Sequence, residues 1–461
     1  MQNSIKWAVV GCVALGMVTA CSTRYGATPG PAETSSSSPV TPPPSPPPPP
    51  PPASVSSDAS AVRELSRTEV AVAGHEISKP EEPKPQPAAQ AGLLTAGDYD
   101  DVLNPELYKA YLDKELQGEL KDQDLPYVDA NRRIAIRVVD RLGKPVPLAD
   151  LTLLSAEGET VFPLKTGANG LTYLYPAFDL LKAGMRVRAG SAAGTPVTKD
   201  LTADLLEKGG EVLIELGADR TKPDKLDLLL TIDATGSMSD EMNYLQKELE
   251  GILGRVKAAN PGLDIHAGLI VYRDNGDEYV VRDFAFTGDF DAFKANLNNQ
   301  RADGGGDFPE AMHEAMRRGL DFKWRPDAVK VNMLVADAPP HDGDIAATWD
   351  ATLVSRTRGI HIVPLAASGV DKTAEFLMRA SAQITGGRYL FLTDDSGIGN
   401  PHAEPTVDCY VVTRLDSLVT RVLTSLVRGE RVEPEGAEVL RTVGNYRSGV
   451  CKVDVEDLAG Q

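Results

Sequence analysis

The chain has 461 residues, more than one ordinary domain needs, so its length indicates two or three domains. A formal net charge of −19 excludes binding of nucleic acid or of anionic lipid through a basic face. An apolar fraction of 42% is enough to build hydrophobic cores.

Residues 1–21 have the pattern of a secretory signal. Lys6 precedes an apolar run over residues 7–20, which is too short to span a bilayer comfortably. The run ends in the letters VTAC and resembles the bacterial lipobox, whose cysteine is acylated and becomes the mature N-terminus. The resemblance implies a lipid anchor at Cys21 and, because Ser22 follows it, the outer membrane of a bacterial cell envelope. A cleaved signal with a chance cysteine is the alternative.

Residues 22–92 form a linker rich in Pro and Ser, which we expect to be disordered. Residues 42–52 are proline except for Ser45. Polyproline rises about 3.1 Å per residue, so this stretch makes a semi-rigid spacer of about 34 Å, or else a docking ligand for aromatic grooves.

A short helical segment is expected within residues 93–128. Apolar residues recur with helical spacing over residues 105–120, which predicts a docking helix. Asp98, Asp100 and Asp101 precede it, and we expect a capped turn there, because no EF-hand loop follows to bind calcium.

Residues 129–217 change to a period of two. Short alternating runs such as residues 134–138 are separated by turn signals, among them Gly143-Lys144-Pro145 and Asn169-Gly170. This pattern predicts a small all-β sandwich. The run at residues 139–146 with the later Asn-Gly turn resembles carboxypeptidase-regulatory-like sandwiches. We find no catalytic constellation in it and expect a spacer or a packing partner.

Residues 224–430 alternate between strands and helices. The expected strands are residues 226–232, 265–272, 279–284, 329–336, 360–365 and 388–392, and a last helix is expected from about 413 to 428. Alternation of this kind predicts an α/β fold with a doubly wound, mainly parallel sheet. Ligands of such sheets bind at the carboxyl ends of strands.

Three loops at strand ends or helix starts carry oxygen-bearing side chains. They read DATGSMS from Asp233, GGGDFPE from Gly304, and ADAPPH from Ala336. In the first loop a carboxylate and two hydroxyls stand at alternate positions. Hard divalent cations such as Mg²⁺ and Ca²⁺ take oxygen ligands of this kind.

The three motifs, in this order, resemble von Willebrand factor type A domains of the hemicentin and alpha-kinase-associated type. The resemblance implies a Rossmann-like fold and a metal-ion-dependent adhesion site. It assigns Asp233, Thr235 and Ser237 as first-loop ligands, Asp307 as the second-loop ligand, and Asp337 as the third-loop carboxylate, direct or through water. Asp307 stands where integrins have Thr. Three carboxylates leave a divalent ion at a formal charge of −1, which disfavours direct coordination of a partner's carboxylate and favours Ca²⁺ or a structural role.

Each ligand has a structural alternative. Asp307 and Glu310 form a capping-box pattern, Ser237 is a candidate N-cap, and Asp337 is a candidate strand terminator. His313 and His341 have no zinc-site spacing, and we expect surface or cap roles for both. Ser237 lacks a G-x-S-x-G context, so no hydrolase elbow is supported and the chain is not expected to be an enzyme.

Two cysteines remain in the folded part, Cys409 and Cys451. An exported protein permits disulfides, so we expect a bridge that pins the acidic tail, residues 431–461, to the α/β domain. Two free buried thiols are the alternative.

Two function classes follow. In the first, the chain is an envelope lipoprotein that binds a protein or glycan partner through the cation. In the second, the metal is structural and the chain is an accessory subunit of an envelope assembly or transport machine. Loss of partner binding in EDTA separates them.

Overall fold

The computed structural model describes residues 92–191, 194–217, 222–240, 242–398, 402–403 and 405–452. Every described residue belongs to one compact unit, Gln86–Gln461. The predicted signal segment, Cys21 and the predicted linker up to residue 91 lie outside the described residues. Within the described ranges, no helix combines the length and the apolar character needed to cross a membrane.

A nine-stranded sheet has the order β11-β10-β9-β12-β13-β14-β1-β15-β16. Its strands are β1 (Thr95–Tyr99), β9 (Lys225–Asp233), β10 (Asp264–Tyr272), β11 (Val281–Thr287), β12 (Val329–Ala336), β13 (Ile360–Ala366), β14 (Tyr389–Thr393), β15 (Tyr410–Arg414) and β16 (Arg441–Val443). Strands β10, β9, β12, β13 and β14 are parallel, and β11 pairs antiparallel with β10. The predicted α/β class with a mainly parallel sheet is therefore confirmed.

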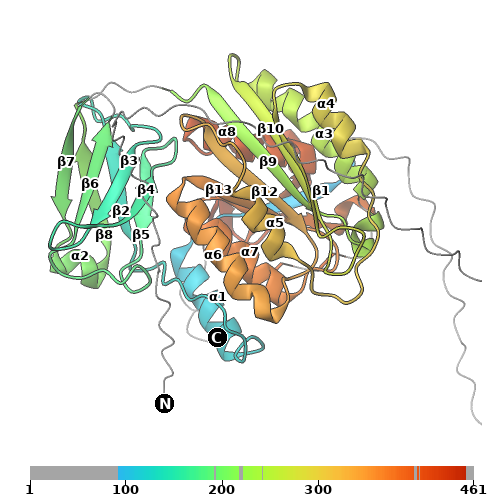
Figure 1. Cartoon of the computed structure of the whole chain (residues 1–461), viewed down its shortest axis with the longest axis horizontal. Helices are drawn as coiled ribbons and strands as arrows, with labels where there is room; N and C mark the ends of the chain where they lie inside the picture. The colour runs from blue at the N-terminus through green and yellow to red at the C-terminus, as the bar shows by residue number, and fades with distance from the viewer. Residues whose placement is uncertain are drawn as a thin grey trace, which may run out of the picture. The chain divides into compact units, whose positions relative to one another are not determined.

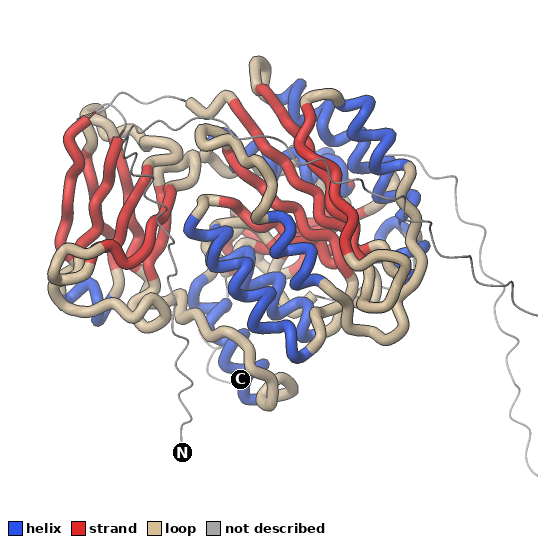
Figure 2. The backbone as a smooth tube through the Cα atoms, viewed as in Figure 1, coloured by secondary structure: helices blue, strands red, loops and turns tan. Residues whose placement is uncertain are grey.

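Helices cover both faces of this sheet (Figures 1 and 2). One face carries α3 (Met242–Ala259), α4 (Phe290–Asn298) and α8 (Leu415–Arg428), and the other carries α5 (Met312–Gly319), α6 (Ile345–Thr357) and α7 (Lys372–Thr385). Successive side chains of a strand point to opposite faces. Leu228 and Leu230 of β9 accordingly lie in the core under α3 and α8, whereas Leu229 lies in the core under α5. Burial on both faces explains the nearly continuous apolar run of β9.

Strand β1 was not predicted. It lies between β14 and β15, antiparallel to both, although it precedes them by about three hundred residues. Gly97 is required there, because a Cβ at this position would lie 2.6 Å from Cε2 of Phe391. The predicted helix is α1 (Pro105–Gln117). The segment 93–128 therefore supplies a strand of the large sheet as well as a helix.

The three acidic residues beside β1 have different roles. Asp100 accepts a hydrogen bond from the backbone of the following turn, as predicted. Asp98 and Asp101 are buried and form ion pairs, Asp98 with Arg431 at 3.1 Å and Asp101 with Arg379 at 2.7 Å. The expectation of a simple capped turn was incomplete, because all three carboxylates pair with arginines from distant parts of the chain, Asp100 with Arg431 at 3.0 Å.

The sandwich region consists of two sheets inserted between α1 and β9. One has the order β5-β2-β8 and the other β4-β3-β6-β7. The elements are β2 (Ile134–Val139), β3 (Asp150–Leu154), β4 (Thr160–Lys165), β5 (Leu171–Leu174), β6 (Arg186–Ser191), β7 (Gly194–Asp200), α2 (Ala203–Lys208) and β8 (Gly210–Glu215). Inward side chains of both sheets share one apolar core, as the alternating pattern predicts.

The C-terminal part returns to the large sheet. Strand β16 pairs with β15, and a hairpin of β17 (Tyr446–Arg447) and β18 (Val450–Cys451) follows. In the structure a disulfide joins Cys409, next to β15, to Cys451 of β18. Residues 431–452 are thus joined to the α/β region by strand pairing and by the bridge.

Candidate metal centre

The first loop leaves one carboxylate oxygen uncommitted. Asp233 is the last residue of β9, and its side chain is fully buried. Its Oδ1 accepts hydrogen bonds from the backbone N of Thr235 at 3.0 Å and from Thr235 Oγ1 at 2.7 Å. The hydroxyls of Thr235 and Ser237 lie 3.1 Å apart. Oδ2 of Asp233 is buried and has no hydrogen-bond partner, so one buried acceptor of the first loop is left unsatisfied.

The third loop places a second carboxylate beside the first. Strands β9 and β12 are parallel neighbours, so Asp337, one residue beyond β12, emerges next to Asp233. Asp337 is 2% exposed. Burial, and next to it the charge of Asp337, raises the pKa of Asp233 to about 7. Two carboxyl groups therefore share a site that has little solvent to screen them.

The glycines of the second loop hold it against the first. The backbone N of Gly236 donates to the carbonyl of Gly304 at 3.0 Å, and Gly305 N donates to Asp277 Oδ2 at 2.9 Å. Gly304 has a φ of +80°, and a Cβ there would collide with the carboxylate of Asp277. The triple glycine thus permits a close approach of backbone to backbone.

Glu310 supplies a third buried carboxyl group, which the sequence analysis did not select as a ligand. It is 3% exposed, and its backbone N donates to the carbonyl of Pro339 in the third loop at 2.9 Å. A Cβ on Gly305 would lie 3.0 Å from its Oε1, while its Oε2 is buried without a hydrogen-bond partner. Burial, then the charges of Asp233 and other nearby carboxylates, raises the pKa of Glu310 to about 9.

Asp307, the predicted second-loop ligand, differs from this group in its burial. Its side chain is exposed, whereas Asp233, Asp337 and Glu310 are buried. The capping-box alternative for Asp307 and Glu310 is wrong, because α5 begins later, with Ala311 at its N-cap and no side-chain cap. Glu310 stands just before the apolar start of α5, but the family resemblance assigned the second-loop ligand to Asp307, beside the glycines.

Further residues surround the carboxyl groups. Tyr272, the last residue of β10, is fully buried, and burial followed by the charge of Asp233 raises its pKa well above its ordinary value. His341 Nε2 lies 2.7 Å from Asp274 Oδ1, and this hydrogen bond raises the pKa of His341. His341 therefore ties the third loop to the loop after β10, in addition to the surface or cap role expected for it, since it is the N-cap residue of the short 3-10 helix Asp342–Asp344.

The donor chemistry fits a hard cation. Two buried carboxylate oxygens, Asp233 Oδ2 and Glu310 Oε2, have no hydrogen-bond partner, and the hydroxyls of Thr235 and Ser237 lie beside Asp233. Buried acceptors of this kind are costly unless a cation or proton satisfies them. No group of three His, Cys, Asp or Glu side chains arranged to hold a metal occurs among the described residues. The hydroxyls of Thr235 and Ser237 are further oxygen donors of the kind that Mg²⁺ and Ca²⁺ accept.

Comparison with known proteins identifies the region that carries these loops. Residues 227–396 match the family model described as von Willebrand factor A domain. The chain is 30% identical over 188 residues to the putative ariadne-like RING finger protein R811 of Acanthamoeba polyphaga mimivirus, a match covering 36% of this chain and 18% of that protein. It is 30% identical over 127 residues to the alpha-protein kinase vwkA of Dictyostelium discoideum, covering 27% of this chain and 20% of that protein. The chain thus spans a fifth or less of the length of these relatives.

The chain also resembles solved structures at low sequence identity. The conserved hypothetical protein BatB from Bacteroides thetaiotaomicron is 12% identical, with a TM-score of 0.32, over 44% of this chain and 99% of that one. The open conformation of the pilus adhesin SpaC from Lactobacillus rhamnosus GG is 13% identical, with a TM-score of 0.32, over 46% of this chain and 31% of that one. On the match of residues 227–396 and the sheet that they build, the α/β region of this chain contains a von Willebrand factor A domain.

Proposed function

We propose that this chain binds a protein or glycan partner through a divalent cation, Mg²⁺ or Ca²⁺, held where the three loops meet. The ligands are Asp233, Thr235, Ser237, Glu310 and Asp337. The observation that carries the proposal is the buried Oδ2 of Asp233, which has no hydrogen-bond partner and belongs to a carboxyl group next to that of Asp337. A divalent cation would satisfy this oxygen and remove the repulsion between the two carboxylates.

In this proposal Glu310 takes the place that the sequence resemblance gave to Asp307. Glu310 is buried within reach of the charges of Asp233 and Asp337, whereas Asp307 is exposed. Asp307 and the neighbouring Phe308, which is 46% exposed, then form part of the rim that a partner contacts. An exposed aromatic side chain beside a charged site is the kind of residue that anchors protein interfaces.

The proposal also covers where the chain acts, on a bacterial envelope membrane, and that it is a binding protein. Cys21 is the lipid attachment site, and the chain acts from the outer membrane of a bacterial cell envelope, with the proline-rich linker as a spacer. The support is the sequence alone, namely the short apolar run and the VTAC ending. We propose a binding role rather than a catalytic one, because the serine of the first loop lacks the sequence context of a nucleophile.

The experiment is recovery of partners from envelope extracts with the mature chain, in Mg²⁺, in Ca²⁺ and in EDTA. Partners that are lost in EDTA and lost with Asp233→Ala support the proposal. Asp321→Ala is the matched control, since Asp321 is exposed on the same domain. Partners retained in EDTA while the melting temperature falls would contradict a bridging cation, and would favour a structural metal in an accessory subunit.

A further inference from the structure

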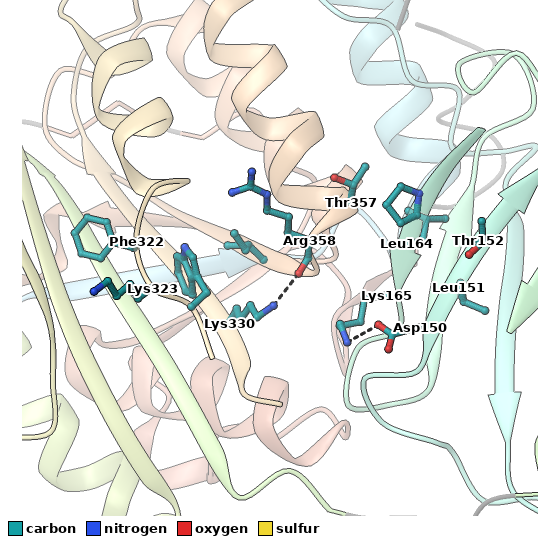
Figure 3. A pocket seen from close by; sticks show the side chains of 13 residues that line it. Asp150, Leu151, Thr152, Leu164, Lys165, Phe322, Lys323, Lys330, Thr357 and Arg358 are labelled. Atoms are coloured by element: carbon teal, nitrogen blue, oxygen red, sulfur yellow. Dashed lines mark hydrogen bonds and ion pairs between the residues drawn. The ribbon is translucent and has the colours of Figure 1, made fainter. Parts of the chain in front are cut away.

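A second candidate site lies at the opposite end of the sheet from the metal centre. A cavity of about 550 Å³ opens between β3 and β4 of the sandwich and the starts of β12 and β13 (Figure 3). Lys330 is the second residue of β12 and Ile360 is the first of β13. The metal-centre loops follow the other ends of the same sheet, so the two sites share no residue.

The sandwich and the α/β region on either side of this cavity are held together by buried contacts. The guanidinium of Arg356, from α6, pairs with the carboxylate of Asp179 at 2.7 Å, and both side chains are buried. Arg356 also donates to the carbonyl of Tyr173 at 2.8 Å. Beside the cavity, a Cβ on Gly359 would lie 2.9 Å from Cβ of Lys165. The buried ion pair of Arg356 and Asp179 is joined by two parallel hydrogen bonds, and the backbone packs closely beside it, so the cavity is preformed.

Cationic side chains dominate the cavity. Lys165, Lys323, Lys330 and Arg358 line it, against the single carboxylate of Asp150. Lys165 Nζ lies 2.7 Å from Asp150 Oδ1 (Figure 3), so that pair is internally neutral. The other three cations give an excess of positive charge in a chain whose net charge is −19. A local field of this sign concentrates anions.

Lys330 is the strongest indication of a ligand. It is 7% exposed, and its ammonium donates to the carbonyl of Arg358 at 3.1 Å (Figure 3). An ammonium has three donors, and that carbonyl takes one of them. Burial, and next to it the charge of Lys165, lowers the pKa of Lys330. A nearly buried ammonium beside another cation is stabilised when an anion enters the cavity.

Aromatic side chains form the other part of the lining. Phe322 and Trp324 line the cavity, and both rings pack edge-on against Phe286, with centroids 5.2 Å and 4.8 Å away. Trp324 Nε1 donates to the carbonyl of Gly319 at 2.9 Å, which fixes the indole. The rings therefore offer a rigid apolar surface close to the cations. Ligand sites combine an apolar lining with a few placed polar groups in this way.

We propose that the cavity between the sandwich and the von Willebrand factor A domain binds a small organic carboxylate, whose acid group meets Lys330 and whose apolar part lies on Phe322 and Trp324. This cavity does not need the cation of the proposed metal centre. A negative result here would therefore leave the proposed cation-dependent binding function untouched, and the reverse also holds.

The test uses the mature full-length chain in EDTA and two probes of nearly equal shape, 4-fluorobenzoate and the neutral 4-fluorobenzamide. Fluorine NMR line widths, titrated at fixed ionic strength, report the affinity of each probe. We expect the carboxylate to bind at least tenfold more tightly than the amide. Equal binding of the two probes overturns the proposal.

Variants locate the binding. Lys330→Met should reduce the affinity for 4-fluorobenzoate at least fivefold, and Lys330→Arg, which keeps the charge, should reduce it less. Lys199→Met on β7, at the far edge of the same sandwich sheet as β4, is the control and should have no effect. If Lys330→Met does not fold, Trp324→Leu replaces it, with the same expected loss. Unchanged binding in the folded variant overturns the proposal.

Discussion

Replacing Glu310 by Gln should stabilise the metal-free protein and weaken its binding of cations. In the folded chain the pKa of Glu310 is raised to about 9, so the group keeps its proton at pH 8, whereas in the unfolded chain it releases it near its usual pKa of 4.5. Keeping that proton costs about 1.4 kcal/mol for each pH unit above 4.5, which gives at most about 5 kcal/mol at pH 8. The amide of Gln has nearly the same shape and escapes this cost.

The measurement is chemical unfolding in EDTA at pH 8 and at pH 5. Because the pKa of Glu310 is raised, the folded wild type holds a proton that the unfolded chain releases, and its free energy of unfolding falls as the pH rises between about 4.5 and 9. The variant should therefore exceed the wild type at pH 8 and nearly equal it at pH 5. With Ca²⁺ or Mg²⁺ present, Glu310→Gln should bind the ion at least tenfold more weakly, because it lacks a buried carboxylate ligand.

Asp307→Asn is the matched comparison. Asp307 is exposed, so its replacement should change the free energy of unfolding by no more than about 0.5 kcal/mol and should preserve the response to cations. The reasoning is refuted if Asp307→Asn abolishes the response while Glu310→Gln retains it. The ligand would then be the residue that the sequence resemblance indicated.

Three further predictions concern the wild-type chain and its cysteines. The pKa values of Asp233 and Glu310 are raised to about 7 and about 9, so the melting temperature in EDTA should fall as the pH rises from about 5 to about 9. Added Ca²⁺ should reduce this dependence of the melting temperature on pH. A fall of the same size with Ca²⁺ present would contradict the prediction. Removing the Cys409–Cys451 bridge, whose residues are 42 apart, should cost at most about 4 kcal/mol, and two thiols labelled in denatured, unreduced protein would rule the bridge out. Cys21→Ser should release the protein from the membrane fraction or block processing, and normal membrane partition of this variant would end the lipid-anchor hypothesis.

The sequence predicted the sheet because its strands have long apolar runs. Strand β9 is buried on both faces over nearly its whole length, and this burial is the reason for its run of Leu and Ile. Strand β1 escaped prediction for the opposite reason. It is five residues long and contains Gly97 and Asp98, both unfavourable in strands. Its partners lie far along the chain, and only packing against Phe391 and pairing with arginines explains it.

The first loop of the candidate site was predictable because its side chains follow one another at alternate positions after β9. The structure brings Asp337 to Asp233 because β9 and β12 are parallel neighbours, as the expected topology requires. The preference for Glu310 over Asp307 in the proposed site was not predictable from the sequence. It depends on the path of the glycine loop, which is set by hydrogen bonds to the first loop and to Asp277. These hydrogen bonds join residues far apart in the sequence, so no local sequence pattern predicts them.

The central claim is that a divalent cation binds where the three loops meet. The most direct measurement is the melting temperature of the wild type and of Asp233→Ala, each in EDTA and then in excess Mg²⁺, Ca²⁺ or Mn²⁺. At a hundredfold excess of cation over its dissociation constant, the wild type should gain about 2.7 kcal/mol of stability, and its melting temperature should rise. Asp233→Ala should show no such rise. A wild-type melting temperature that ignores all three cations and EDTA alike would contradict the claim.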